Sequence, residues 1–173
     1  PTNTYSPQNL SDSSSTINDA AKNTVRSYVL AESPDQIATF LMEVSENAHK
    51  SSLTRDVCLM SATIQFLLLR NMRDLTALLE RFEKLFSSQD GRESHLSRYV
   101  GFSFWLVKIC QRGGESTAKL FQWLCGSFRH ETQFDKAWGA EVAKIGKIYF
   151  NIQPPPNMMD MLSSMLGGGG GGK

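Results

Sequence analysis

Apolar residues recur at intervals of three and four along most of the chain, and this spacing constrains the fold more than any other sequence feature. The clearest example is the segment 72–86, whose recurring side chains are Leu75, Leu78, Leu79, Phe82, Leu85 and Phe86. Such spacing gathers apolar side chains on one face of an α-helix. Because no segment shows a convincing strand alternation, the pattern predicts an all-α protein.

Residues that start and stop helices divide the chain into about seven helices. Ser33, Pro34 and Gln36 form a helix start with a capping box, and Asn71 is the expected stop of a central helix. Short connections make neighbouring helices antiparallel, and the helix lengths favour an α-solenoid of stacked antiparallel helical hairpins over a compact bundle. The predicted helices span about 17–30, 34–48, 53–70, 72–86, 94–112, 116–128 and 134–150.

Composition divides the chain into three parts. Residues 1–16 are rich in Ser, Thr, Asn and Pro, so we expect a disordered N-terminal segment. Residues 17–153 form the predicted helical-repeat domain, and 154–173 form a flexible tail rich in Pro, Met and Gly. The formal net charge is only +1. A nucleic-acid partner is not expected, because nucleic-acid surfaces cluster Lys and Arg, which are spread at intervals here.

Residues for catalysis or metal binding are scarce. The histidines lie at or near predicted helix ends, without a second His or a Cys nearby to complete a metal site; they are His49, His95 and His130. The pair Gly113 and Gly114 lacks the strand and the motif of a phosphate-binding loop, so we interpret it as a helix end and a turn. We therefore expect no enzyme activity, no metal site and no cofactor.

The three cysteines, Cys58, Cys110 and Cys125, lie far apart, and each falls within an apolar helical pattern. An odd and sparse count argues against a secreted disulfide scaffold, so we expect reduced core residues and a cytosolic protein. The longest apolar run, 64–69, is far shorter than the roughly 18 residues that a membrane span requires. No basic region followed by an apolar one marks a secretory signal at the start of the chain.

Aromatic side chains crowd into residues 99–150. One helix cannot turn Phe102, Phe104 and Trp105 to the same side, so at least one of them must lie off the main face. Core packing is favoured for Trp105 and Trp138, while Phe102 and Trp123 suit the core and a partner groove equally well. We hypothesise that the last three helices form an apolar groove for an amphipathic partner helix. Its candidate anchors are Phe102, Trp105, Trp123 and Tyr149.

Three stretches of the chain together resemble a known family. They are SYVLAESPDQIATFLMEV at 27–44, ATIQFLLLRNMRDLTALLERF at 62–82 and IGKIYFNIQPPP at 145–156. Their order and spacing are similar to the second half of Golgi-to-ER traffic protein 4, a family that includes a subunit of the transmembrane-domain recognition complex. The resemblance covers residues 17–156, and none of its motifs is a catalytic signature.

The resemblance implies a non-catalytic α-solenoid adaptor in the cytosolic delivery of tail-anchored membrane proteins to the ER membrane. In that family the C-terminal half holds a ubiquitin-like-domain cochaperone or, in animals, a BAG-family protein, and the N-terminal half contacts a targeting ATPase. We expect this chain to keep the cochaperone role and, lacking the first half, to lose the ATPase contact. The connection at 87–93 is shorter than the insertion with which some members embrace the partner.

Two other interpretations remain open at this stage. An unrelated helical-repeat adaptor, such as a tetratricopeptide-like protein, would predict basic carboxylate-clamp residues on the inner helices, and these are not visible. A small helical enzyme would need convergent titratable groups, for which the scarce His and the scattered Asp and Glu offer little.

Overall fold

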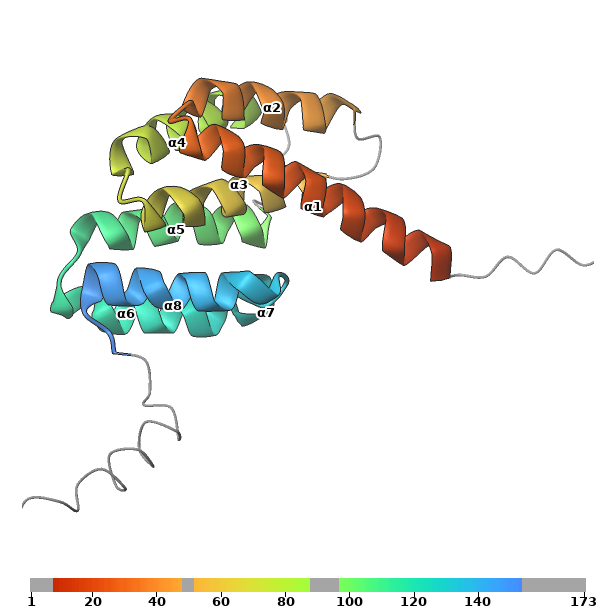
Figure 1. The fold of residues 1–173 in the computed structure, drawn as a ribbon. Coiled ribbons are helices and arrows are strands. Elements are labelled where there is room, and N and C mark those ends of the chain that lie inside the picture. Colours follow the sequence, from red (N-terminus) through yellow and green to blue (C-terminus); the bar gives the residue numbers. More distant parts are fainter. Residues whose placement is uncertain (1–7, 48–51, 88–96, 154–173) are drawn as a thin grey trace, which may run out of the picture.

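The structure, a computed structural model, describes residues 8–47, 52–87 and 97–153, and within these residues it contains eight helices and no strand. The predicted all-α fold of stacked helices is confirmed. Figure 1 shows the helices lying side by side in an array. They are α1 (Gln8–Leu30), α2 (Pro34–Asn47), α3 (Ser52–Leu68), α4 (Met72–Ser87), α5 (Arg98–Arg112), α6 (Glu115–Ser127), α7 (Arg129–Thr132) and α8 (Lys136–Phe150).

Helix α1 begins earlier than the sequence pattern predicts. The expected start is Ile17, whereas the helix begins at Gln8 and so includes most of the segment expected to be disordered. No Pro or Gly interrupts residues 8–16, and extending a formed helix is easier than nucleating one. At 8–16 the structure thus shows helix where the sequence pattern predicts a disordered segment. Its remaining part at 1–7, the tail at 154–173 and the connection at 88–93 lie outside the described residues.

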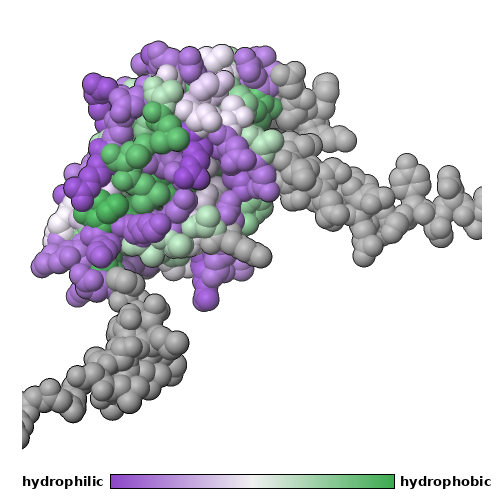
Figure 2. All heavy atoms as spheres, in the orientation of Figure 1, coloured by the Kyte–Doolittle hydropathy of each residue, from purple (hydrophilic) through white to green (hydrophobic). Residues whose placement is uncertain are grey.

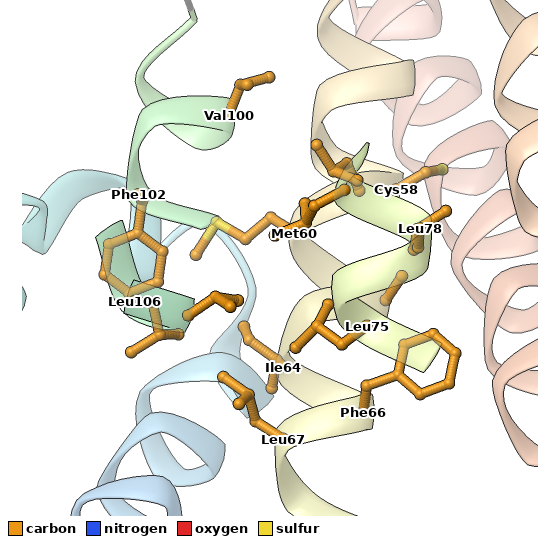
Figure 3. Close-up of a cluster of buried hydrophobic side chains, with 14 of the residues drawn as sticks. Cys58, Met60, Ile64, Phe66, Leu67, Leu75, Leu78, Val100, Phe102 and Leu106 are labelled. Atoms are coloured by element: carbon orange, nitrogen blue, oxygen red, sulfur yellow. The ribbon is translucent and has the colours of Figure 1, made fainter. Parts of the chain in front are cut away.

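Helix α3 lies at the centre of the array and packs against α1, α2, α4, α5 and α8. Residues 56–64 are all buried, so no side of the helix faces water there. Even Thr63 is fully buried, and its hydroxyl donates to the carbonyl oxygen of Leu59 at 2.9 Å. In Figure 3, Met60 and Ile64 of α3 lie between side chains of α4 and α5; these are Leu75, Leu78, Phe102 and Leu106.

The first two hairpins, α1–α2 and α3–α4, share the same turn. Each first helix is followed by a left-handed residue, Glu32 with φ 51° and Arg70 with φ 57°. In both turns the next amide donates to a carbonyl five residues back; the pairs are Ser33 to Tyr28 at 3.1 Å and Asn71 to Phe66 at 2.9 Å. This arrangement satisfies the open carbonyls at the helix end. The hairpins then stack, α1 on α3 and α2 on α4, as in a solenoid.

Asn71 does not end α3, contrary to the sequence prediction. Arg70 takes the left-handed conformation, and Asn71 instead caps α4, because its side-chain oxygen accepts from the Asp74 amide at 3.2 Å. The Asn71 side-chain amide in turn donates to the Asp74 carboxylate at 2.8 Å. This reciprocal pair resembles a capping box. The boundary was predicted correctly, but the residue belongs to the following helix.

The C-terminal helices do not simply add further stacked hairpins. Helix α5 packs beside α3 and α6 packs against α5, but α8 returns to contact both α6 and α3. Gly113 and Gly114, with φ 58° and 78°, turn the chain between α5 and α6 as predicted. Figure 1 shows α8 in front of α6, with the short α7 at one end of both. The sequence pattern missed α7, and Phe134, the predicted start of the last helix, lies in the turn between α7 and α8.

Candidate functional site

Two of the four predicted anchors belong to the interior. Phe102 on α5 is fully buried, and its ring centre lies 5.5 Å from that of Phe128. Tyr149 on α8 is half-buried and donates its hydroxyl to the carbonyl oxygen of Leu67 at 3.2 Å. Both side chains connect neighbouring helices. Phe102 presents no surface to a partner in this structure, so we assign it to the core.

The other two predicted anchors are exposed tryptophans. Trp105 is 57% exposed and Trp123 is 64% exposed, whereas Trp138 is buried as expected. The core preference for Trp105 is therefore wrong. The reason is that the buried surface of α5 is already filled by other residues, which are Val100, Phe102, Ser103, Leu106, Val107, Ile109 and Cys110.

Trp105 and Trp123 lie at the same level of the α5–α6 hairpin. Trp105 is eight residues before Gly113, and Trp123 is nine residues after Gly114. With a rise of about 1.5 Å per residue, both lie about 12–14 Å from the turn along the helix axes. Because α5 and α6 are antiparallel neighbours in contact, the two indoles lie at matching heights.

Contacts between the helices show which side of α5 carries Trp105. Phe102 contacts Phe128, and Arg98 donates to the carbonyl oxygen of Ser127 at 2.8 Å, so both residues lie on the side that faces α6. Trp105 follows Phe102 by three residues, and residues at this spacing are neighbours on a helix surface. Trp105 therefore borders the α6 side of α5 while remaining open to solvent.

The matching side of α6 carries Leu120, which is 41% exposed and which the sequence analysis did not single out as an anchor. Leu120 precedes the buried Leu124 by four residues, so it borders the buried side of α6. Trp123 follows Leu120 by three residues on the outer surface. We call the surface made by Trp105, Leu120 and Trp123 the α5–α6 patch. Its signal in the sequence is an apolar set wider than one buried face of each helix.

An ion pair fixes the open end of this hairpin. Arg98 donates to both carboxylate oxygens of Glu131 in α7, and its guanidinium lies 4.9 Å from the ring centre of Phe128. Burial by itself raises the pKa of Glu131, but the hydrogen bonds and the charge of Arg98 outweigh burial and lower this pKa below its ordinary 4.5. The carboxylate stays ionised at neutral pH and holds α7 against α5.

A second ion pair joins the first helix to the last. Lys22 of α1 lies 2.6 Å from a carboxylate oxygen of Asp135, whose other oxygen accepts from the Ala137 amide at 2.8 Å and so caps α8. Burial raises the pKa of Asp135, but the hydrogen bond from Lys22 outweighs this effect and the net shift is downward. This ion pair therefore holds α1 to the start of α8, and α8 in turn packs against α6.

Several acidic side chains of the C-terminal helices form ion pairs or hydrogen bonds with neighbouring helices. Glu131 and Asp135 form the ion pairs above, and Glu141 accepts from the Gln65 side-chain amide at 2.9 Å. By contrast, several basic side chains on α5, α6 and α8 are exposed; they are Lys108, Arg112, Lys119, Lys144 and Lys147. Glu115 is exposed as well, so the surface of these helices carries a basic excess.

A second group of exposed apolar side chains lies at helix ends. Leu30 is the last residue of α1 and Leu69 follows α3, and both are exposed. These helix ends are on the left in Figure 1, and Figure 2 shows hydrophobic surface on that side of the molecule. Exposed leucines are common on protein surfaces, whereas tryptophan is enriched at the residues that dominate binding energy. The α5–α6 patch is the stronger candidate for this reason.

The cysteines are poorly suited to chemistry. Burial raises the pKa of Cys58 and of Cys110 to about 12, and that of Cys125 to about 11. At neutral pH these groups are protonated thiols that pack as small apolar side chains. The predicted core position is confirmed for Cys58 and Cys110, and Cys125 is half-buried.

Among the residues that the structure describes, no group of three His, Cys, Asp or Glu side chains is placed to hold a metal ion. His130 is exposed on α7, and His49 and His95 lie outside the described residues. A search of the same residues for a helix both long enough and apolar enough to span a membrane finds none.

Stacked helical hairpins and an exposed aromatic patch define the class of the protein as a helical-repeat array. The family model of Golgi to ER traffic protein 4 matches residues 10–168, and the chain belongs to this family. The match confirms the resemblance carried by the three stretches of sequence. It is a non-enzymatic family of adaptor type, and membership places the chain in Golgi-to-ER traffic and the targeting of tail-anchored proteins. No curated protein and no solved structure matches the chain.

Proposed function

We propose that this protein is a cytosolic, non-catalytic adaptor in the delivery of tail-anchored membrane proteins to the ER membrane, and that its C-terminal helices hold a cochaperone. The cochaperone carries a ubiquitin-like domain or belongs to the BAG family. The α5–α6 patch is the contact surface in this proposal. Trp105, Leu120 and Trp123 are its anchors, whereas Phe102 and Tyr149 pack between neighbouring helices.

The observation that carries the proposal is the pair of exposed tryptophans at one level of the α5–α6 hairpin, in a chain of this family. Large exposed indoles are costly to leave in water and are typical anchors of protein interfaces. The ion pair of Arg98 and Glu131 and the buried contact of Phe102 with Phe128 keep the hairpin rigid. A rigid surface loses little conformational freedom when a partner binds.

The test is capture of partners from cytosol with the full chain as bait, followed by mass spectrometry. We expect a ubiquitin-like-domain or BAG-family cochaperone to be recovered, and the double variant Trp105→Ala/Trp123→Ala to lose at least ten times in recovery. The matched control is Leu30→Ala/Leu69→Ala, which removes exposed apolar side chains at the helix ends and should leave recovery unchanged. Circular dichroism checks that each variant is helical. Equal recovery by both double variants would refute the assignment of the α5–α6 patch as the cochaperone-binding surface.

A further inference from the structure

We propose that the α5–α6 patch binds an acidic amphipathic helix of its partner. The apolar face of that helix covers Trp105, Leu120 and Trp123, and its carboxylates face Lys108 and Lys119. This inference rests on the proposed function, because it specifies the chemistry of the segment that the cochaperone presents at the same site.

The dimensions of the patch suit a helix. Trp105 and Trp123 stand at one level on two helices whose axes are separated by about 8–10 Å, the usual spacing of packed helices. A helix with its side chains is about 10–12 Å wide. Leu120 precedes Trp123 by three residues, so the two side chains are neighbours on α6. One apolar helix face can therefore touch all three side chains.

The lysines beside the patch favour a partner helix that carries negative charge. Lys108 follows Trp105 by three residues, and its Nζ lies 5.9 Å from the centre of the Trp105 ring. Lys119 precedes Trp123 by four residues and is exposed. Both lysines thus flank the indoles on the helix surface. A partner helix with carboxylates along its edges gains complementary charge on both sides, whereas a basic helix is repelled.

Several acidic side chains of the C-terminal helices already have partners within the fold, which strengthens the preference for an acidic partner helix. Glu131, Asp135 and Glu141 form partly buried bonds with Arg98, Lys22 and Gln65, so these carboxylates already have partners within the fold. The exposed Glu115 stands at the turn end of α6, away from the level of Trp123. The immediate surroundings of the indoles are therefore basic, although the whole chain is nearly neutral.

An anionic membrane surface would also favour lysine and tryptophan, but the patch suits a protein better. Lys144 and Lys147 lie on α8, which packs against α6 and α3, whereas Lys108 and Lys119 lie on α5 and α6 beside the indoles. Membrane attachment through electrostatics depends on clusters of four or more basic residues. Two lysines beside two indoles match the size of a single helix instead.

Two designed peptides test the proposal. They share the same apolar helix face, and one carries Glu and the other Lys at the polar positions. Binding of each labelled peptide to the full chain is followed by fluorescence anisotropy. We expect the acidic peptide to bind at least ten times more tightly than the basic one. Equal binding of both peptides, or a preference for the basic one, would overturn the proposal.

Charge-reversed variants locate the effect. Lys108→Glu/Lys119→Glu should weaken binding of the acidic peptide at least tenfold, and both residues are exposed, so the fold is expected to persist. Lys144→Glu/Lys147→Glu makes the same change of charge on α8 and should leave binding unchanged. If the two variants weaken binding equally, the effect comes from net charge and the proposal fails. Trp105-dependent sedimentation with phosphatidylserine vesicles, together with no binding of the acidic peptide, would also overturn it.

The two proposals fail separately. If the wild-type chain and Lys108→Glu/Lys119→Glu capture the same amount of cochaperone, the proposed function stands and the acidic-helix inference is wrong. If no cochaperone is captured but the acidic peptide still binds with the expected dependence on Lys108 and Lys119, the inference stands and the cochaperone proposal is wrong.

Discussion

The α1–α4 region and the α5–α8 region bury their apolar residues in different ways. In α1–α4, two hairpins with the same left-handed turn stack on each other, and α3 is enclosed by five neighbouring helices. In α5–α8, the last helix returns to α3 and α6, and Trp105, Leu120 and Trp123 remain exposed on α5 and α6. The difference shows that the burial of an apolar helix depends on how many other helices pack around it.

The comparison is sharpest between two aromatic residues of the same helix. Phe102→Ala removes a fully buried ring and should lower the free energy of unfolding by about 3–5 kcal/mol. Trp105→Ala removes an exposed indole and should change it by about 0.5 kcal/mol or less. Equilibrium urea unfolding of both variants measures these values. Equal losses would show that Trp105 is part of the core.

Gly146 tests how tightly α8 packs in the C-terminal region. An added Cβ at Gly146 would lie 2.9 Å from a ring carbon of Phe121, which is buried against Phe150, so Gly146→Ala should cost about 1–3 kcal/mol. Gly139→Ala in the same helix meets nothing within 4 Å and should stabilise by about 0.5–1 kcal/mol. Thermal unfolding followed by circular dichroism compares the two. A neutral Gly146→Ala would mean that α6 and α8 are packed more loosely.

The ion pair between Arg98 of α5 and Glu131 of α7 should make the free energy of unfolding depend on pH in the acidic range. The folded-state pKa of Glu131 lies below its ordinary 4.5, so its contribution is complete above about pH 4.5 and is lost as the pH falls through the lowered value. Glu131→Gln should therefore lose less stability than the wild type between about pH 5 and pH 3. The exposed Glu115→Gln serves as the control and should keep the wild-type profile. Urea midpoints across this pH range decide the matter, and a wild-type profile for Glu131→Gln would contradict the pairing.

The repeated turn of the α1–α4 region should give the smallest effect. Arg70 has φ 57°, a conformation that glycine adopts without strain, so Arg70→Gly should stabilise by up to about 1 kcal/mol. Glu80→Gly, in the exposed middle of α4, should instead cost about 1 kcal/mol. Chemical unfolding of the two variants should show opposite signs. The same sign for both would indicate that the turn is not held in its left-handed form.

Local features of the fold could be predicted from the sequence because they depend on residues close together in the chain. The glycines at 113 and 114 marked a turn, and the boundary near Asn71 was placed correctly. The role of Asn71 was assigned to the wrong helix because a side chain that can end one helix can also cap the next. The start of α1 was missed because polar residues without Pro or Gly give no signal that stops a helix.

The candidate site could be predicted only in part, because exposure depends on distant elements. The sequence identified an excess of aromatic residues in α5 and α6, but the positions of Phe102 and Trp105 relative to α3 and α6 decide which ring is buried. The pairing of Lys22 with Asp135 joins residues 113 apart in sequence, and that of Gln65 with Glu141 joins residues 76 apart. Spacing along one helix does not contain such information.

The most direct test of the central claim is hydrogen–deuterium exchange of the full chain, alone and with a cochaperone of the proposed ubiquitin-like-domain or BAG-family kind. The claim is that α5–α6 is the partner surface and that α1–α4 is the supporting core. We predict slower exchange of amides around Trp105 and around Leu120 and Trp123 in the complex, with little change in α1 and α2. Slower exchange confined to α1–α4, with α5 and α6 unchanged, would contradict this account.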